Sequence, residues 1–308
     1  MGESLSDVIN GGSWGWRATA DGPFAGRSFA ELQHVVGGVL GAAPRAADAV
    51  ASAGGADAPP STVSTSFDWR DERPECIHAI RDQGKCGGCW AEAATEVLSD
   101  RLCLHTNGSV NVVVSPLDLL ACSKKNRGCA GGFPDKAWEY IAASGLYADA
   151  CIPWNLTDSL LCPLSRCTNG ASPPQLLRDQ PKYWVSKQPT YAVLGDLGAE
   201  IAAHGPVEAV FTVHEDFMQY ESGIYTYVSG KSIGQHAVKI LGWGEGTVVN
   251  ATTNASTVVP YWIAANSWNV SWGEQGYFRI AKGQCGIDTA CTAGKVTYVR
   301  DHKRALQA

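Results

Sequence analysis

The spacing of apolar positions changes midway along the chain. From Cys89 to Cys103 apolar residues recur every three or four positions, which predicts a helix. Three more helices are expected: one from Pro116 with Ser115 as its cap, one from Pro134 to a stop at Gly145, and one from about Leu194 to His204 before Gly205-Pro206.

Beyond Pro206 the pattern favours strands. Four are expected: Val207–Val213, His236–Trp243, Tyr261–Asn266 and Tyr277–Ile280. The Thr-, Asn-, Val- and Ser-rich stretch Gly246–Val259 predicts an exposed, glycosylated hairpin loop between two of them. Helices followed by strands predict an α+β fold in two lobes.

The first third of the chain divides differently. Residues 41–66 are rich in Ala, Gly, Pro, Ser and Asp without apolar periodicity, which predicts a linker. The short segment before it must pack on the body, because its apolar residues are too few for a core of their own: Trp14, Trp16, Phe24, Phe29, Leu32, Val35 and Val36. This layout is typical of a zymogen. We expect a pro-segment and linker over residues 1–64 and a catalytic body over 65–308, helical at about 76–190 and β-rich at about 191–299.

Charge and hydropathy exclude some partners. The net charge is −6 and the pI about 5.6, so no basic stripe is available to neutralise the phosphates of a nucleic acid. No run of 18 apolar residues is present, so no membrane span is expected. We expect a monomer without nucleic-acid or membrane partners.

The chain has eleven cysteines. Cys-x-x-Cys occurs once, at Cys86 and Cys89, which favours disulfides over a metal site, and we expect neither metal nor cofactor. An odd number leaves one thiol unpaired. Five Asn-x-Ser/Thr sequons indicate a secreted or lysosomal/endosomal glycoprotein: Asn107, Asn155, Asn250, Asn254 and Asn269.

The N-terminus shows no signal peptide. Met1-Gly-Glu-Ser-Leu-Ser6 fits the loose N-myristoylation pattern. A cytosolic lipid anchor conflicts with a disulfide-rich, glycosylated body, so we interpret the match as accidental. We expect the natural N-terminus to lie upstream.

The stretch Gln83-Gly-Lys-Cys-Gly-Gly-Cys-Trp90 places Cys89 at the start of the first predicted helix of the body. Backbone N–H groups and the helix dipole favour a thiolate there and lower the thiol pKa. Gly87 and Gly88 allow a sharp turn into the helix. A disulfide half-cystine explains this segment equally well.

A cysteine nucleophile needs a base and a group that orients the base. Among seven histidines, His236 stands out because it begins an apolar strand, although a structural role is commoner for such a residue. Asn266 ends another predicted strand, where it would accept an imidazole N–H or simply form a turn.

In three segments the chain resembles the papain-like cysteine peptidases, and specifically their cathepsin B-like branch. The segments are the Cys89 stretch, Gly-Gln-His-Ala-Val from Gly234, and Asn-Ser-Trp-x-x-x-Trp-Gly-x-x-Gly from Asn266. A fourth, Gly128-Cys-Ala-Gly-Gly-Phe-Pro-Asp-Lys-Ala-Trp138, is similar to cathepsin B itself. The resemblance covers residues 67 to about 299. It implies a two-lobed papain-like fold with a helical lobe, a β-barrel-like lobe and a cleft between them.

The resemblance also implies roles. Cys89 is the expected nucleophile, His236 the general base and acid, and Asn266 the orienting group. Gln83 and the Cys89 N–H are expected to form the oxyanion hole. The substrate-binding residues implied are Gly131, Gly132, Phe133, Pro134, Ala237, Trp268 and Ala290.

The family framework suggests disulfide partners as well. Five pairs are expected: Cys76–Cys103, Cys86–Cys129, Cys122–Cys162, Cys151–Cys167 and, from the two cysteines that remain, Cys285–Cys291. Cys89 alone is then free. The implied activity is hydrolysis of peptides or proteins through an acyl-enzyme, with the pro-segment as the chain's own inhibitor.

Four positions depart from the family pattern. Gly88 replaces Ser or Ala, and Glu92 replaces an aromatic residue at a place where a carboxylate suits the helix dipole. The span Cys151–Cys162 is a shortened occluding loop without histidine, which favours endopeptidase over carboxydipeptidase activity. Ala290 replaces an acidic residue, which predicts an apolar second subsite. A non-enzymatic binding protein and an exopeptidase remain the competing hypotheses.

Overall fold

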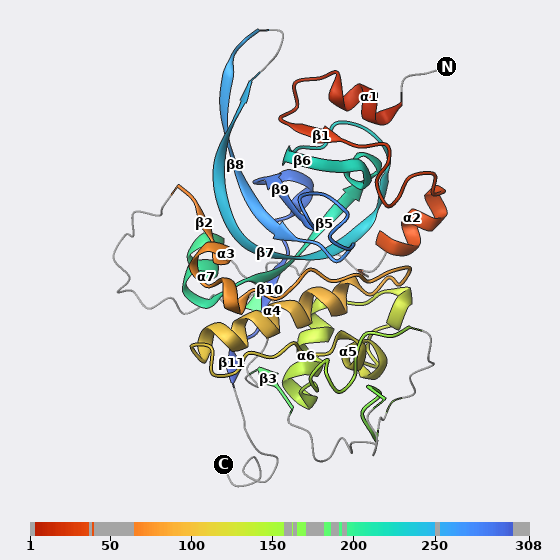
Figure 1. The fold of residues 1–308 in the computed structure, drawn as a ribbon, viewed down its shortest axis with the longest axis vertical. Helices are drawn as coiled ribbons and strands as arrows, with labels where there is room; N and C mark the ends of the chain where they lie inside the picture. Colours follow the sequence, from red (N-terminus) through yellow and green to blue (C-terminus); the bar gives the residue numbers. More distant parts are fainter. Residues whose placement is uncertain are drawn as a thin grey trace.

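The computed structural model describes residues 4–36, 39, 65–156, 162, 165–170, 182–185, 191–192, 196–249 and 253–297. A helical lobe and a sheet lobe pack together, and the N-terminal segment lies against the sheet lobe (Figure 1). Apart from residues 65 and 66, the predicted linker falls outside these ranges. No helix within them is long and apolar enough to cross a membrane.

The predicted helices are present, with small shifts at their ends. The helices are α1 (Leu5–Asn10), α2 (Phe29–Val36), α3 (Trp69–Glu72), α4 (Cys89–His105), α5 (Pro116–Cys122), α6 (Pro134–Ser144) and α7 (Leu197–His204). Ser115 caps α5 by accepting the Asp118 N–H, and Gly145 ends α6. α7 begins three residues later than predicted, because the Asp196 carboxylate accepts the Ala199 N–H as its cap.

Strands dominate the second half, as predicted. They are β1 (Trp16–Ala18), β2 (Phe67–Asp68), β3 (Trp184–Val185), β4 (Tyr191–Ala192), β5 (Val207–His214), β6 (Tyr220–Tyr225), β7 (Ser232–Val249), β8 (Ser256–Ala265), β9 (Tyr277–Ala281), β10 (Cys291–Ala293) and β11 (Val296–Thr297). The main sheet has the order β1-β6-β9-β8-β7-β5-β10-β4, with β2 added on β7. Its pairs are antiparallel except β6 with β9. Across the described residues the sheet is open, so the barrel-like closure expected for this lobe is absent.

One predicted loop is mostly strand. Gly246–Val259 was expected as a hairpin loop, but Gly246 pairs with Val259 and the ladder continues outward to Val249 and Ser256. The β-branched Thr and Val residues of this stretch suit extended backbone. β7 and β8 therefore form a long curved hairpin that projects from the sheet (Figure 1).

The N-terminal segment adds a strand to the sheet lobe. β1 pairs antiparallel with β6, and the Ile224 N–H donates to the Gly15 carbonyl at 2.9 Å. The Trp16 indole N–H donates to the Thr226 carbonyl at 3.0 Å, and its ring packs on Tyr225 with centroids 5.1 Å apart. As the sequence predicted, this segment has no core of its own and shares the core of the sheet lobe.

Four of the five expected disulfides are present: Cys76–Cys103, Cys86–Cys129, Cys122–Cys162 and Cys151–Cys167. The fifth prediction is wrong, because Cys285 and Cys291 are both free thiols. Cys291 lies on the core side of β10 and donates to the Ile287 carbonyl, whereas Cys285 sits in a tight turn and hydrogen-bonds with the Tyr225 hydroxyl. Three cysteines rather than one are therefore unpaired.

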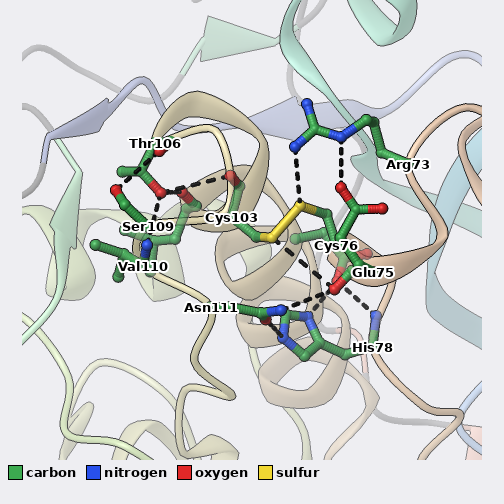
Figure 2. Close-up of a disulfide and its surroundings, with 11 residues drawn as sticks. Arg73, Glu75, Cys76, His78, Cys103, Thr106, Ser109, Val110 and Asn111 are labelled. Carbon is green, nitrogen blue, oxygen red and sulfur yellow. Dashed lines mark hydrogen bonds and ion pairs between the residues drawn. A yellow bond between two sulfur atoms is a disulfide. The ribbon is translucent and has the colours of Figure 1, made fainter.

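A disulfide anchors the C-terminal end of α4 (Figure 2). Cys103 in its last turns is bonded to Cys76, the last residue of the short 3-10 helix Pro74–Cys76 that follows α3. Beside the bridge, the Asn111 amide donates to the Glu75 carbonyl at 2.8 Å, and Asn111 Oδ1 lies 2.9 Å from His78 Nε2. The helix that begins at Cys89 is thus held firmly at its far end.

Among the described residues the apolar core has a large cluster in each lobe, a small cluster of Leu241, Ile263 and Ala265 in the sheet lobe, and another small cluster between the lobes. The cluster at the lobe interface contains Cys89, Ala93, Val210, Ala237 and Ala290. Its members come from α4 on one side and from the sheet on the other, with Ala290 immediately before β10. The fold thus places the Cys89 thiol at the junction of the two lobes.

Candidate active site

Cys89 is the first residue of α4 and is a free thiol, so the half-cystine alternative does not hold in this structure. Its Sγ accepts the Ala237 N–H from the opposite lobe at 3.5 Å. A Cβ at Gly87 would lie 2.6 Å from the Cys129 carbonyl oxygen, so a glycine is needed there for close backbone packing. Gly88 has a φ of −97°, a value that any residue adopts. Its role is therefore also to allow close packing, and not to reach a backbone conformation that only glycine tolerates.

The His236 ring is held by Asn266 and Trp268. Nε2 lies 2.8 Å from Asn266 Oδ1, which can only accept, so Nε2 carries the proton in the neutral ring. The Trp268 ring stacks beside the imidazole with centroids 4.6 Å apart. Nδ1 is buried and has no hydrogen-bond partner within the described parts of the chain. This nitrogen is therefore available to take a proton.

Gln83 lies at the same junction. Its side-chain Oε1 accepts the Ser267 hydroxyl at 2.6 Å, and its backbone N–H donates to the Ser267 carbonyl at 2.9 Å. Its Nε2 donates to the Cys86 carbonyl at 2.8 Å and to the Val35 carbonyl of the N-terminal segment at 3.0 Å. A backbone carbonyl of the N-terminal segment therefore occupies the donor that was predicted for the oxyanion.

The same segment reaches the predicted substrate-binding residues. Val39 pairs with Gly132 in a parallel β-bridge and packs against the interface cluster around Cys89. A Cβ at Gly132 would lie 2.5 Å from the Trp90 ring, so only glycine fits at this position. Phe133 and Pro134 follow directly and are half-buried where α6 begins.

Burial controls the ionisation of both reactive groups. Cys89 and His236 are each 0 % exposed. Burial raises the pKa of the Cys89 thiol to about 12, despite the Ala237 N–H. It lowers the pKa of His236 to about 4, despite the Asn266 hydrogen bond. The lowered thiol pKa expected at a helix N-terminus is therefore not found while the N-terminal segment covers the site, because loss of hydration outweighs the helix dipole.

Glu92 also differs from expectation. It lies on α4 three residues after Cys89, is 1 % exposed, and comes within 3.5 Å of the Arg81 guanidinium without a hydrogen bond. Burial raises its pKa to about 8, which Arg81 only partly offsets and Glu96 increases. At acidic pH it is therefore a neutral acid, not a carboxylate stabilised by the helix dipole.

Two residues at the interface escaped prediction. Val210 lies in the Cys89 cluster and Glu208 is fully buried on the same face of β5. Both sit in a stretch, Val207–Val213, that the sequence marks only as a strand. Because Glu208 and Val210 alternate with Val207, Ala209 and Phe211, the sequence does indicate that the two sets lie on opposite faces of the strand. It does not indicate which face meets the helical lobe, because both faces of this strand are buried.

Comparison with known proteins identifies the family. A family model described as papain family cysteine protease matches residues 63–295. The chain therefore belongs to the papain family of cysteine proteases. Across 267 residues it is 41% identical to cathepsin B-like cysteine proteinase 4 of Caenorhabditis elegans, covering 76% of this chain and 75% of that protein.

Two further comparisons agree. The chain is 39% identical over 257 residues to the gut-specific cysteine proteinase of Caenorhabditis elegans, covering 76% and 74% of the two chains. Its structure superposes on procathepsin B S9 of Trypanosoma congolense with a TM-score of 0.78 and 30% identity, covering 97% and 99% of the two chains. The papain-like fold and the cathepsin B-like branch predicted from sequence are confirmed, and the Trypanosoma congolense structure is that of a pro-form.

Proposed function

We propose that this cathepsin B-like protease is the zymogen of an endopeptidase that uses Cys89 as nucleophile, His236 as base and acid, and Asn266 to orient the imidazole. The proposal rests on the arrangement of the Cys89 thiol and the His236 imidazole. The free thiol begins α4 with the Ala237 N–H directed at its sulfur, while the adjacent imidazole is held through Nε2 and keeps Nδ1 open.

The residues support an acyl-enzyme route. Nδ1 of His236 takes the Cys89 proton, and the thiolate attacks the substrate carbonyl carbon. The oxyanion that forms accepts hydrogen bonds from the Cys89 N–H and from Gln83 Nε2, the donor that now holds the Val35 carbonyl. The imidazolium gives its proton to the leaving amine. Water, deprotonated by the same ring, then releases the acid and restores the thiol.

The N-terminal segment is proposed to be the inhibitor, with residues 1–64 removed on activation. Its backbone occupies Gln83, its Val39 pairs with Gly132, and its Phe24 packs edge-on against Trp268 with centroids 5.0 Å apart. These contacts cover each part of the proposed site at once. Removing the segment rehydrates the thiol and imidazole, which favours the charged pair that burial now suppresses.

Substrate preference follows from the short loop and from Ala290. The span from Cys151 to Cys162 has no histidine to bind a C-terminal carboxylate, so internal peptide bonds are the proposed target. Ala290, Ala237 and Val210 make an apolar wall, which favours an apolar side chain in the second subsite. Four disulfides and five sequons support a lysosomal, endosomal or secreted location, because disulfides persist in oxidising compartments.

The test uses the full chain after removal of the N-terminal segment. Wild type is expected to cleave blocked internal peptides faster than dipeptide substrates with a free carboxylate, and Cys89→Ser is expected to lose activity on both. Cys285→Ser is the matched control, since this free thiol lies outside the proposed site, and it should retain cleavage. Equal activity in Cys89→Ser would overturn the proposal, as would an inert wild type, which favours the binding-protein hypothesis. Preference for free-carboxylate dipeptides would overturn the endopeptidase assignment alone.

A further inference from the structure

The sequon at Asn269 lies beside the proposed active site. Asn269 directly follows Trp268, whose ring stacks on the His236 imidazole with centroids 4.6 Å apart, and Ser271 completes the sequon. Residues 262–268 are buried, whereas Asn269 is exposed. A sugar on the Asn269 amide would therefore stand at the edge of the site.

The chain around Asn269 is held in place by hydrogen bonds. Its φ is 69°, in the left-handed region that asparagine tolerates better than most residues. Its N–H donates to the Arg81 carbonyl at 3.0 Å, and its side-chain amide donates to Asp82 Oδ2 at 3.1 Å. Its Oδ1 accepts the Ser271 N–H at 3.1 Å. The Asn269 side chain is therefore fixed against the segment that leads into Gln83.

N-glycosylation of Asn269 is compatible with these hydrogen bonds. In the transfer, Nδ2 loses a proton and bonds to the anomeric carbon of an oligosaccharide, while the bond from that carbon to a polyprenyl pyrophosphate oxygen breaks and the lipid pyrophosphate leaves. Nδ2 has two hydrogens, and only one is replaced. The other still donates to Asp82, and Oδ1 still accepts the Ser271 N–H. The glycan thus starts from an anchored amide.

The N-terminal segment shows which end of the site the sequon borders. Phe24 packs edge-on against Trp268 with centroids 5.0 Å apart. Further along the chain the segment contacts Gln83, and after that Val39 pairs with Gly132. Trp268 and Gly132 therefore lie at opposite ends of the path that the segment takes across the site.

In the proposed mechanism these two ends receive different parts of a substrate. Gly132 lies at the acyl end, because Val39 pairs with it while packing against the cluster that contains Ala290. His236 gives its proton to the leaving amine, and Trp268 stacks on this ring. The Trp268 end therefore receives the residues that follow the scissile bond, and the sequon borders this leaving-group side.

We propose that Asn269 carries an N-linked glycan that narrows access to the leaving-group side of the site, so that the enzyme selects unfolded polypeptides over folded proteins. A thin, extended chain passes beside the sugars, whereas a folded substrate must displace or order them, which costs conformational freedom. This inference rests on the proposed function and names a substrate class for it. It is carried by the place of the sequon next to Trp268 and by an amide that is exposed yet anchored to Asp82.

The first measurement is the occupancy of Asn269. The full chain is secreted from a eukaryotic host and digested, and the peptide that contains Asn269 is examined by mass spectrometry before and after a peptide N-glycosidase, which converts a glycosylated asparagine to aspartate. A glycan is expected on wild type and none on Ser271→Ala, which removes the sequon but keeps Asn269 and its bond to Asp82. An unmodified Asn269 in wild type would overturn the inference.

The second measurement is the substrate preference of the processed enzyme. One cleavage sequence is offered as a blocked peptide and in an exposed loop of a folded carrier domain. In Ser271→Ala, kcat/KM for the carrier should rise at least about threefold over wild type, because no sugars have to be displaced, while kcat/KM for the peptide stays the same. Wild type trimmed by an endoglycosidase to the first sugar should change in the same direction.

Two matched variants serve as controls. Ser109→Ala removes the sequon of Asn107, which follows the end of α4 remote from Cys89, and Ser271→Thr keeps the sequon; both should behave as wild type. An unchanged ratio of carrier to peptide cleavage in Ser271→Ala would overturn the inference, and if that variant fails to fold, an unchanged ratio in trimmed wild type does so. If wild type cleaves neither substrate, the proposed function itself fails.

Discussion

Replacing Glu92 by glutamine is expected to change how the stability of the protein depends on pH. Glu92 is buried on α4 beside Glu96 and Asp149, with the Arg81 guanidinium 3.5 Å away. Burial raises its pKa from 4.5 to about 8. Glutamine has the shape of the neutral acid but cannot ionise, so it isolates the cost of the charge.

The direction in which stability changes with pH follows from the raised pKa of Glu92. In the unfolded chain Glu92 ionises near pH 4.5, whereas in the folded chain it holds its proton until about pH 8. Its contribution to folding is therefore intact below pH 4.5 and declines as the pH rises through this window. One pKa unit corresponds to about 1.4 kcal/mol, so the loss between pH 5 and 7 is on the order of 3 kcal/mol.

Urea unfolding of the full chain, followed by tryptophan fluorescence at several pH values, measures this directly. The free energy of unfolding of Glu92→Gln minus that of wild type should rise with pH by about 1 kcal/mol per unit between pH 5 and 7.5. Glu139→Gln, a surface carboxyl paired with Lys125 and Lys136, is the matched control and should give a flat difference over this range. A flat difference for Glu92→Gln as well would refute the reasoning.

Three further outcomes are expected. Asn266→Ala should lower kcat/KM at least about tenfold and alter the pH profile, because His236 loses its 2.8 Å partner; an unchanged profile would argue against an orienting role. The denatured, unreduced chain should bind three equivalents of a thiol reagent, mapped by mass spectrometry to Cys89, Cys285 and Cys291; one equivalent would restore the disulfide predicted between the last two. Trp16→Ala should weaken inhibition by the N-terminal segment, measured as faster cleavage of a blocked internal peptide before processing, because β1 loses the hydrogen bond from the Trp16 indole to the Thr226 carbonyl; an equal cleavage rate would show that β1 contributes little.

Much of the site could be predicted because its parts are local motifs. The helix from Cys89, the strand from His236 and the strand end at Asn266 each have a pattern in the sequence, and the structure brings the three together. Four disulfides followed from the family framework. The pairing of Cys285 with Cys291 failed because nearness in sequence says nothing about which face of β10 the second thiol occupies.

Other features depend on contacts between distant segments. Burial is the main cause of the raised pKa values of Cys89 and Glu92, and no local sequence pattern reports burial. The prediction from sequence therefore overestimated the effect of the helix dipole on both groups. Glu208 became visible only through its register with Thr292 and its bond to Trp138 in the other lobe. The long β7–β8 hairpin looked like a loop because its polar Thr and Asn residues hide a continuous ladder.

The most direct test of the account is the rate at which iodoacetamide alkylates Cys89, followed by mass spectrometry as a function of pH. In the full chain Cys89 should react slowly, since it is 0 % exposed and burial raises the pKa of its thiol to about 12. After removal of the N-terminal segment it should react at least about a hundredfold faster near pH 5 and lose peptide cleavage in step with labelling. Equal rates before and after processing, or cleavage that survives complete alkylation of Cys89, would contradict the central claim.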